Sequence, residues 1–462
     1  MDRIIDEIVQ VRVSDAVAAA SATSVNTAAV VGVTTKDGAA TQVLYGQDAV
    51  KEAYETGTKR VIIIEPSLTT AASGDVVLKL GTTAVSTVSV KETSTVRSLV
   101  KDLASKFVCE GYSAKASSTT LTITSDAYGA TASEDGAFSI VYNSTGFSGS
   151  PTNTDGTEGA DIVRVSAAFF EEEPNPGKLV CIPVASEPTG ANIADTLDAA
   201  LAMGKDANNR TIDFYNVIVR LGEGATKNGV VALVTALEVW CKANYKLAHV
   251  EVQNRIVGED ALAELSANPP TRVAIFFHKE VSGKSFAAAL VANRCGNDPA
   301  RGTWAHKTLA SITADATSKE NFIDAQDLGL NVYVKVAGVD RSYFGTTGSK
   351  TQFIDSVVKK DWLKFRTQEA IFNLLGSANN GDGVDFNDAG IQSVAAALTG
   401  IFTLAQDNEH RYVLPDSADV SVPLYKDIPA EDKDVRNLPR VRATFQIQES
   451  IHTVKTVELQ VL

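Results

Sequence analysis

Helical and strand patterns alternate between Ile193 and Ala314, and this alternation constrains the fold more than any other feature of the chain. Two segments have the spacing of helices: IADTLDAALAMGKDA and VVALVTALEVWCKANYK. Three short apolar segments have the length and composition of buried strands: FYNVIVRL, AHVEVQN and RVAIFFH. This order predicts an open sheet with helices covering it. We therefore expect an α/β core in this part of the chain.

The composition is typical of a large globular protein. The chain has 462 residues, of which 44% are hydrophobic and 21% are charged, so we expect roughly two to four domains with cores of their own. The formal net charge is −14. This charge argues against nucleic acid as a partner, because phosphate contacts need a concentrated basic surface.

No stretch of the sequence approaches the roughly 20 uninterrupted apolar residues of a membrane span. The first ten residues, MDRIIDEIVQ, are too acidic and too polar for a secretory signal. We therefore expect no membrane partner, and a protein that is made and kept in a cytoplasm.

The positions of the cysteine, histidine and aspartate residues do not match a known metal site, so we expect no metal centre and no cofactor. The cysteines are widely scattered and expected to be free thiols: Cys109, Cys181, Cys241 and Cys295. The histidines lack metal-ligand spacing and are expected to be structural: His249, His278, His306, His410 and His452. Asp382, Asp385 and Asp388 lie close together, but the EF-hand spacing and its closing glutamate are missing.

One segment imitates a nucleotide-binding loop. RVAIFFHKEVSGKSFAAALVA has the order strand, loop and helix, and Gly283, Lys284 and Ser285 match the GK[ST] end of that motif. The first glycine of the motif falls on His278, so the loop lacks the glycine that would let its backbone wrap a phosphate. The sequence therefore argues against nucleotide hydrolysis here.

The character of the chain changes between about residues 60 and 160. From Ser73 onward the segment is rich in Thr, Ser, Gly and Val, with strand patterns VVLKL, VSTVSV, LTITS and FSIVY around a single helix, STVRSLVKDLASKF. That helix carries an apolar face made of Val96, Leu99, Val100, Leu103 and Phe107. We expect a small β-rich module covered by one amphipathic helix, inserted into a larger domain.

Both ends of the chain show the period-two alternation of strands. Near the start, Val9, Val11 and Val13 alternate with polar residues, and a stretch of small residues follows. Near the end, the odd positions from Val441 to Val461 are mostly apolar; they include Phe445, Ile447, Ile451, Val457 and Leu459. The residues alone leave two alternatives open: both ends pair within their own subunit, or they add to an open sheet edge of a neighbouring one.

A long helix around Asp355 has an apolar stripe, formed by Ile354, Val358, Trp362, Phe365 and Phe372. At 100° per residue, Lys360 and Lys364 point away from this stripe. Lys359 and Arg366 lie beside the stripe, on the flank opposite to Lys360 and Lys364. A basic face on an acidic protein has two explanations. It is an ordinary solvated face, or it contacts an acidic partner.

Segments late in the chain resemble a known family. Residues 301–312 read RGTWAHKTLASI, and residues 321–375 read NFIDAQDLGLNVYVKVAGVDRSYFGTTGSKTQFIDSVVKKDWLKFRTQEAIFNLL. In order, they resemble the G-T-W-x-x-K segment, the N-x-Y-x-x-x-A-G run ending in DWL, and the long helix of contractile tail sheath proteins of myophages and R-type bacteriocins. Near the end, ESIH stands where that family often has G-A-I-H, with Ile451, His452 and Val454 at matching places.

The resemblance implies a multidomain α/β (α+β) fold: mixed-sheet core domains with flanking helices, one β-rich inserted module, and extended strand arms at both ends. The implied divisions are an N-terminal arm over 1–24, an αβ core over 25–65 and 160–285, a protruding module over 66–159, a C-terminal inner-wall domain over 286–440, and a C-terminal arm over 441–462.

The resemblance also implies a function. The chain would be a structural subunit and not an enzyme; it would polymerise as stacked hexameric rings around a tail tube and contract to drive the tube through a cell envelope. Implied partners are other copies of the chain through arm exchange, the tail tube protein, and baseplate and tail terminator proteins. The implied location is a virion tail, assembled in a bacterial cytoplasm. The arms would use Val9, Val11, Val13, Phe445, Ile447, Ile451, Val457, Leu459 and Val461, and the tube-facing residues would be Lys359, Lys360, Lys364 and Arg366.

Two other classes remain as alternatives. A tail tube or capsid subunit would share the acidic, β-rich composition, although tube subunits are usually shorter and lack a long αβ core. A P-loop-like NTPase is the less favoured alternative, because His278 stands where its motif needs glycine.

Overall fold

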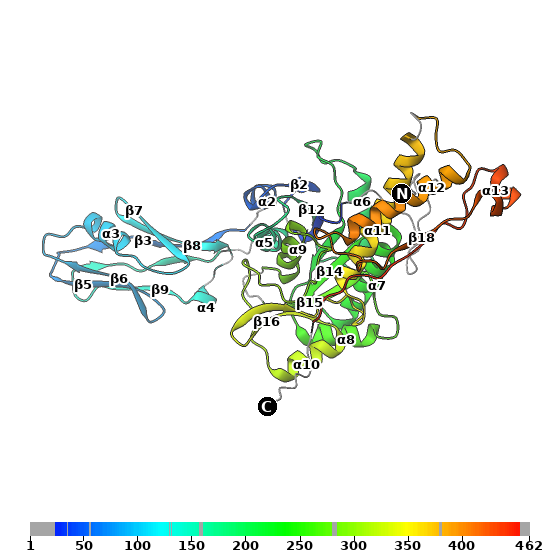
Figure 1. The fold of residues 1–462 in the computed structure, drawn as a ribbon. Coiled ribbons are helices and arrows are strands. Elements are labelled where there is room, and N and C mark those ends of the chain that lie inside the picture. Colours follow the sequence, from blue (N-terminus) through cyan, green and yellow to red (C-terminus); the bar gives the residue numbers. More distant parts are fainter. Residues whose placement is uncertain are drawn as a thin grey trace, which may run out of the picture. The chain divides into compact units, whose positions relative to one another are not determined.

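The computed structural model describes residues 24–34, 36–54, 57–128, 130, 132–156, 160–279, 284–377 and 381–452. Its contacts divide the chain into two compact units. The first comprises the described residues of 1–34, 38–53 and 161–462, and the second those of 35–37 and 54–160. Both helices and sheets are present (Figure 1), so the prediction of a mixed α/β protein is confirmed.

The first unit is built around one eight-stranded sheet, in the order β17-β16-β15-β14-β13-β1-β12-β2. The six inner strands are parallel to one another, and β2 and β17 are antiparallel edges. The strands are β1 (Ala28–Val33), β2 (Gln42–Leu44), β12 (Leu179–Val184), β13 (Asn216–Arg220), β14 (Leu247–Val252), β15 (Val273–Phe277), β16 (Asn331–Val336) and β17 (Val339–Tyr343).

Helices cover both faces of this sheet. On one face, α5 and α9 pack on each other and on β1; on the other, α6, α7, α8 and α10 form a row (Figure 1). Because both faces are covered, β13 and β14 are buried along their whole length. The helices of this part are α2 (Gln47–Tyr54), α5 (Asp161–Phe170), α6 (Ile193–Ala202), α7 (Lys227–Asn244), α8 (Arg255–Leu265), α9 (Phe286–Gly296) and α10 (Lys319–Leu328). The open sheet with covering helices, expected from the alternating pattern, is therefore present.

The sheet does not end where the expected domains divide. We expected a boundary between residues 285 and 286, but β16 and β17 continue the same sheet, and α9 packs on β13, β14 and β15. The reason is that β16 is itself a buried apolar strand, NVYV, which completes the row of parallel strands. The core unit therefore runs through the expected boundary.

The second unit consists of short antiparallel strands around a core of its own. Its sheets have the orders β11-β3-β8-β7, β6-β5-β9 and β10-β4. Its elements are β3 (Lys59–Ile64), β4 (Ser67–Leu68), β5 (Gly74–Leu80), β6 (Thr83–Val90), α3 (Val96–Ser105), β7 (Tyr112–Ser117), β8 (Thr120–Tyr128), α4 (Ala132–Asp135), β9 (Phe138–Val141), β10 (Phe147–Ser148) and β11 (Thr152–Thr154). Strand β3 thus belongs here, although residues up to 65 were expected in the core domain.

Helix α3 covers the core of the second unit. Thr95 caps its first turn in a capping box with Ser98. Leu99, Val100 and Leu103 are buried in a cluster with strands β3, β5, β6 and β8. This is the amphipathic helix that the sequence predicts, with its apolar face turned to the strands.

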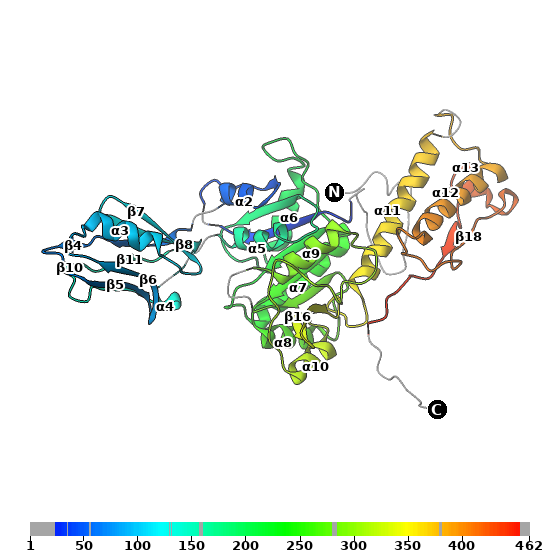
Figure 2. The same cartoon turned by 60° about the vertical axis from the view of Figure 1, so that its left-hand side comes forward.

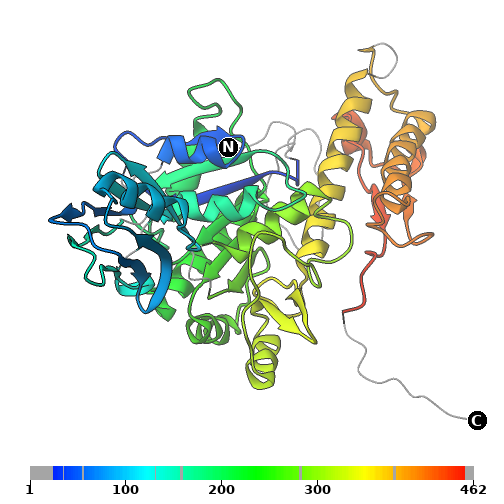
Figure 3. The ribbon, with the colours of Figure 1, turned by 90° about the vertical axis from the view of Figure 1, so that its left-hand side faces the viewer.

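Beyond the sheet, the first unit continues in a helical part with one small sheet (Figure 2). Helices α11 and α12 pack side by side (Figure 3), and β18 pairs with β19. The elements are α11 (Ile354–Ser377), α12 (Asp388–Gln406), β18 (Asp419–Ser421), the 3-10 helix η2 (Tyr425–Asp427), α13 (Ala430–Asp434) and β19 (Arg442–Thr444).

Helix α12 is, among the described residues, the one helix that is long and apolar enough to span a membrane, with a mean hydropathy of 1.3. Its buried residues follow a helical stripe that includes Ile391, Val394, Leu398 and Phe402. The stripe packs against α11 and β18, which is the pattern of an amphipathic helix lying on a partner.

Candidate assembly surfaces

The start of α11 is buried, and this changes the expected role of its lysines. Lys359 has no exposed side-chain surface; its Nζ lies 2.7 Å from Asp355 Oδ2 and donates to the carbonyl oxygen of Gln448 at 2.7 Å. Lys364 is also buried, with its Nζ 3.5 Å from the centre of the Tyr245 ring. The prediction that these two lysines face a tube is wrong for this subunit, because its own chain covers both ammonium groups.

A buried ion pair fixes α11 against the sheet. Asp361 accepts hydrogen bonds from Arg272 Nη1 and Nη2, both at 2.7 Å, and from the Tyr215 hydroxyl at 2.6 Å. All three side chains are buried. Burial and the nearby Asp361 carboxylate raise the pKa of Tyr215 well above its usual value. Helix α11 is therefore anchored where β13 and β15 begin.

Two of the expected tube-facing residues remain accessible. Lys360 is partly buried, and the Arg366 side chain is 41% exposed and paired with Glu369. Further along α11 the exposed residues include two large apolar ones, Phe372 and Leu375. The basic face expected along this helix is thus reduced to Lys360 and Arg366.

The β18–β19 sheet has two open edges. Asp419 pairs with Thr444 and Ser421 with Arg442, and no third strand joins this sheet within the described parts of the chain. A two-stranded sheet is marginally stable on its own in water. Both outer edges offer backbone groups to which a further strand can bind.

The expected C-terminal arm is partly held by its own chain. Beyond β19, the Leu414 N–H donates to the Gln446 carbonyl and the Gln448 N–H to the Tyr412 carbonyl. Ile447 forms a bridge with Val413, and the Phe445 ring packs on Phe402 with centroids 5.2 Å apart. Residues 442–448 therefore pair within this chain, which is the first of the two alternatives left open by the sequence.

The remaining arm positions divide into two groups. Ile451 is 83% exposed. The others lie outside the described residues: Val9, Val11, Val13, Val457, Leu459 and Val461.

Exposed apolar side chains concentrate in the helical part and its small sheet. Of the eighteen large hydrophobic side chains that are exposed among the described residues, eight lie between residues 366 and 452. They are Phe372, Leu375, Leu404, Leu414, Leu424, Tyr425, Val435 and Ile451. Exposed apolar side chains that form a contiguous patch mark surfaces that other polypeptides cover.

The segments that resemble the sheath family meet at one place, which we call the motif junction: residues 303–307, the start of α11, and residues 448–452. Thr303 Oγ1 lies 2.8 Å from His452 Nε2, and His306 Nε2 donates to the His452 carbonyl at 3.2 Å. The Phe353 ring meets the His452 imidazole edge to face, with centroids 4.7 Å apart. Burial lowers the pKa of His452. The junction therefore holds residue 452 against the body of the subunit.

A carboxylate already occupies the N-terminus of α9, where a nucleotide-binding loop would hold phosphate. Glu251 Oε2 accepts from Ser285 Oγ at 2.8 Å and from the Ala287 N–H at 2.7 Å. Lys284 Nζ lies 2.7 Å from Glu171 Oε2 and 3.2 Å from the Ser311 carbonyl. Gly283 lies outside the described residues.

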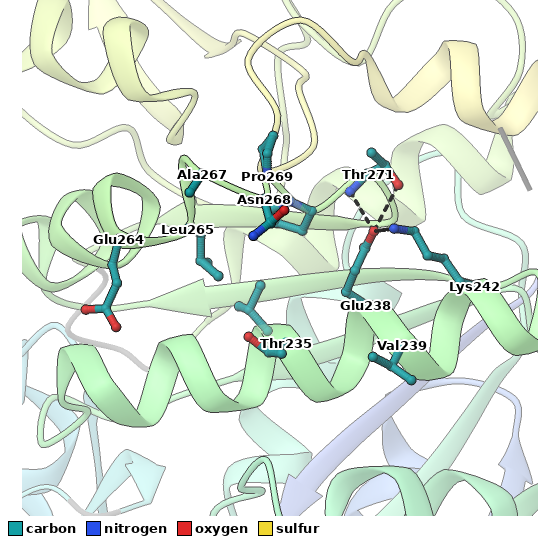
Figure 4. Close-up of a pocket in the computed structure, with 12 residues that line it drawn as sticks. Thr235, Glu238, Val239, Lys242, Glu264, Leu265, Ala267, Asn268, Pro269 and Thr271 are labelled. Carbon is teal, nitrogen blue, oxygen red and sulfur yellow. Dashed lines mark hydrogen bonds and ion pairs between the residues drawn. The ribbon is translucent and has the colours of Figure 1, made fainter.

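The side chains in a pocket beside α7 satisfy one another. Glu238 accepts hydrogen bonds from the N–H and hydroxyl of Thr271 and pairs with Lys242 (Figure 4). The apolar wall includes Val239, which is 67% exposed. No buried polar group in this pocket is left to orient a ligand.

The cysteines are free thiols, as the sequence predicts. Burial raises the pKa of Cys181, Cys241 and Cys295 well above its usual value. Within the described residues, no group of three or more His, Cys, Asp and Glu side chains could hold a metal ion.

The sequence patterns do not reveal the buried ion pair of Arg272 and Asp361, which fixes α11 against the sheet. Arg272 directly precedes the apolar strand VAIFF, and Asp361 interrupts the apolar stripe of α11 between Val358 and Trp362. A charge inside an apolar pattern signals a buried partner, but the pattern does not identify that partner. Comparison with protein-family models and with curated proteins finds no match for this chain.

Proposed function

We propose that the chain is a subunit of a contractile tail sheath, which polymerises as stacked hexameric rings around a tail tube and shortens to drive the tube through a cell envelope. The observation that carries the proposal is the β18–β19 sheet with its two open edges. Strands supplied by other copies of the chain would complete this sheet through main-chain hydrogen bonds. The motif resemblance supports a sheath as the kind of polymer.

The distribution of exposed apolar residues supports polymerisation. Eight exposed large hydrophobic side chains lie between residues 366 and 452, the part of the chain that includes the small sheet and α12. In a polymer, strands and helices of neighbouring copies would cover them, and this burial would contribute about 25 cal/mol per Å² of apolar surface.

The proposal assigns the exchanged strands to the two ends of the chain. The N-terminal strand contains Val9, Val11 and Val13, and the C-terminal one lies beyond His452 and contains Val457, Leu459 and Val461. The motif junction fixes residue 452 to its own subunit, so it would transmit tension between neighbours to the core sheet.

For the contact with the tube, the proposal retains Lys360 and Arg366. Both are accessible in the subunit, at least in part. An acidic tube surface would attract them, and solvated pairs of this kind contribute little enough to separate when the sheath contracts.

Negative-stain electron microscopy of the purified chain, concentrated at moderate salt, tests the proposal. Hollow striated cylinders wider than a tail tube are expected. Discrete small particles, both alone and after co-expression with a tube subunit, would contradict it.

Two truncations test the strand assignment. Ending the chain after His452, or deleting residues 2–14, should leave a folded monomer that forms no cylinders. Ending it after Arg442 is the matched control: this also removes Phe445 and Gln448, which pair with the same chain, so it should lower the stability of the monomer itself. Cylinders formed by the shorter of the two C-terminal deletions would refute the strand assignment.

A charge reversal tests the tube contact separately. Replacing both Lys360 and Arg366 by Glu should prevent coating of preformed tubes and leave cylinders formed without tubes unchanged. Lys101→Glu, an exposed change on α3 of the second unit, is the matched control and should leave coating intact.

A further inference from the structure

A loop of the chain itself covers the β2 edge of the eight-stranded sheet. Within the described residues, β2 pairs with β12 alone. The N–H of Val43, the central residue of β2, donates to Asp206 Oδ2 at 3.0 Å. Asp206 belongs to residues 204–212, which follow α6 and which we call the edge loop; Lys205 and Thr211 form a bridge across it. The main-chain donor that Val43 would offer to a further strand is therefore already used within the subunit.

Asp206 also determines the conformation of the edge loop. Its side chain has no exposed surface. Besides the Val43 N–H, it accepts hydrogen bonds from the N–H groups of Asn208 and Arg210, both at 2.9 Å, and from Arg210 Nε at 2.7 Å. The Arg210 guanidinium lies 5.8 Å from the centre of the Tyr45 ring, one residue beyond β2. The edge loop is thus held by several bonds and contacts the β2 segment at two places.

The opposite edge of the same sheet, β17, is covered as well. The Ser342 N–H donates to the Lys307 carbonyl at 2.9 Å, and the Ser342 carbonyl accepts from the His306 N–H at 2.6 Å. The Asp340 carbonyl accepts from Thr308 Oγ1 at 3.2 Å. Both edges of the large sheet are therefore closed by the chain's own segments, whereas the β18–β19 sheet has no third strand within the described parts of the chain.

This difference between the sheets affects how copies can associate. An uncovered edge strand offers a row of unpaired main-chain groups, with which an extended segment of another chain can pair. Short edge strands, charged side chains that point inward and covering loops are the means by which proteins prevent such pairing. The β2 edge has all three, since it is three residues long, carries the buried Asp206 carboxylate and lies under the edge loop.

We propose that the edge loop, through Asp206, excludes strands of other copies from β2 and so directs strand exchange to the β18–β19 sheet. The excluded strand is the C-terminal segment beyond His452 of a second copy. Val457, Leu459 and Val461 of this segment alternate as the apolar residues of a strand do. The identity of this strand rests on the proposed function, whereas the closure of the β2 edge does not.

A photo-crosslinker beside β2 tests the proposal in the full chain. Tyr45 is 58% exposed and is replaced by p-benzoylphenylalanine. In the otherwise unchanged protein, illumination should link residue 45 to the edge loop of the same chain. Asp206→Ala leaves the Val43 N–H without its acceptor, so links from residue 45 to residues 453–462 of another chain should increase at least fivefold. Asp195→Ala, which removes an exposed carboxylate of α6, is the matched control and should give no increase.

A second variant covers the case in which Asp206→Ala does not fold. Arg210→Gln removes the guanidinium that binds Asp206 and lies beside Tyr45, and it retains the bond between Val43 and Asp206. It should increase the links between chains at least twofold, because the edge loop is held less firmly. The proposal is overturned if every variant that keeps the wild-type urea transition gives the same links between chains as the control.

The crosslinks and the electron micrographs separate this proposal from the proposed function. Links between chains are read at a single residue and need no cylinders. An increase in links without cylinders would support closure of the β2 edge and contradict the sheath. Cylinders without an increase in links would support the sheath and contradict the role of the edge loop.

Discussion

Replacing Asp361 by asparagine should destabilise the first unit by about 3–5 kcal/mol, the usual cost of leaving one member of a buried ion pair without its partner. Asp361 accepts three hydrogen bonds, two of them from Arg272 and all between 2.6 and 2.7 Å. Bonds to a charged group contribute about 1.5–3 kcal/mol each. The asparagine would turn an N–H₂ group toward donors, so at least one bond to Arg272 is lost and the guanidinium keeps a buried charge.

A second variant separates the pair from its surroundings. In the double variant Arg272→Met with Asp361→Leu, both charges are absent, so no unpaired ion remains buried. We expect this variant to be more stable than Asp361→Asn, with a coupling energy of at least about 2 kcal/mol in a double-mutant cycle. Tyr215→Phe removes one hydrogen bond and leaves the ion pair, so it should cost only about 1–2 kcal/mol.

Tryptophan fluorescence during urea unfolding is the assay. The chain has three tryptophans, Trp240, Trp304 and Trp362, and all lie in the first unit, so the signal reports this unit alone. A cost below about 1 kcal/mol for Asp361→Asn, or strictly additive effects in the cycle, would refute the view that this pair anchors α11 on the sheet.

Three shorter predictions concern other parts of the chain. Arg60→Met should destabilise the second unit by about 3 kcal/mol, because the buried guanidinium donates hydrogen bonds to Gly136 and Asn153. Trypsin should then cut within residues 54–160, while the urea unfolding of the first unit, followed by tryptophan fluorescence, stays unchanged. Gly190→Ala should cost about 1–3 kcal/mol by urea unfolding, because the new Cβ would lie 2.5 Å from the carbonyl oxygen of residue 232 on α7. Burial lowers the pKa of His452. The stabilisation from docking of this side chain is therefore present above pH about 6.5 and is lost as the pH falls below that value. Hydrogen exchange of residues 446–452, corrected for intrinsic rates, should accelerate from pH 7 to 5 in wild type but not in His452→Gln.

The architecture could be predicted where periodicity alone determines it. The apolar runs of β13, β14 and β15 and the helical pattern of α7 predict a helix-covered sheet, and the stripe of Leu99, Val100 and Leu103 predicts the helix of the second unit. In each case burial of a contiguous apolar face dominates the free energy of folding, and the spacing of apolar residues within the segment determines that face.

The candidate surfaces were less predictable, because they depend on contacts between distant residues. At 100° per residue, Lys364 turns away from the main stripe, but Tyr245 lies 119 positions earlier in the chain and covers it. Lys359 is buried by Gln448, 89 positions later. Helical geometry gives the direction of a side chain, and only the tertiary fold determines what lies there.

The strand pairing of the second unit makes it replaceable. Strands β3 and β11 are antiparallel neighbours, with Val61 opposite Thr154, so the first and last strands of this unit lie about 5 Å apart. Any domain with similarly close termini could be grafted between Ala53 and Asp161 without changing the strand order of the eight-stranded sheet. In the polymer that we propose, each copy would carry one grafted domain.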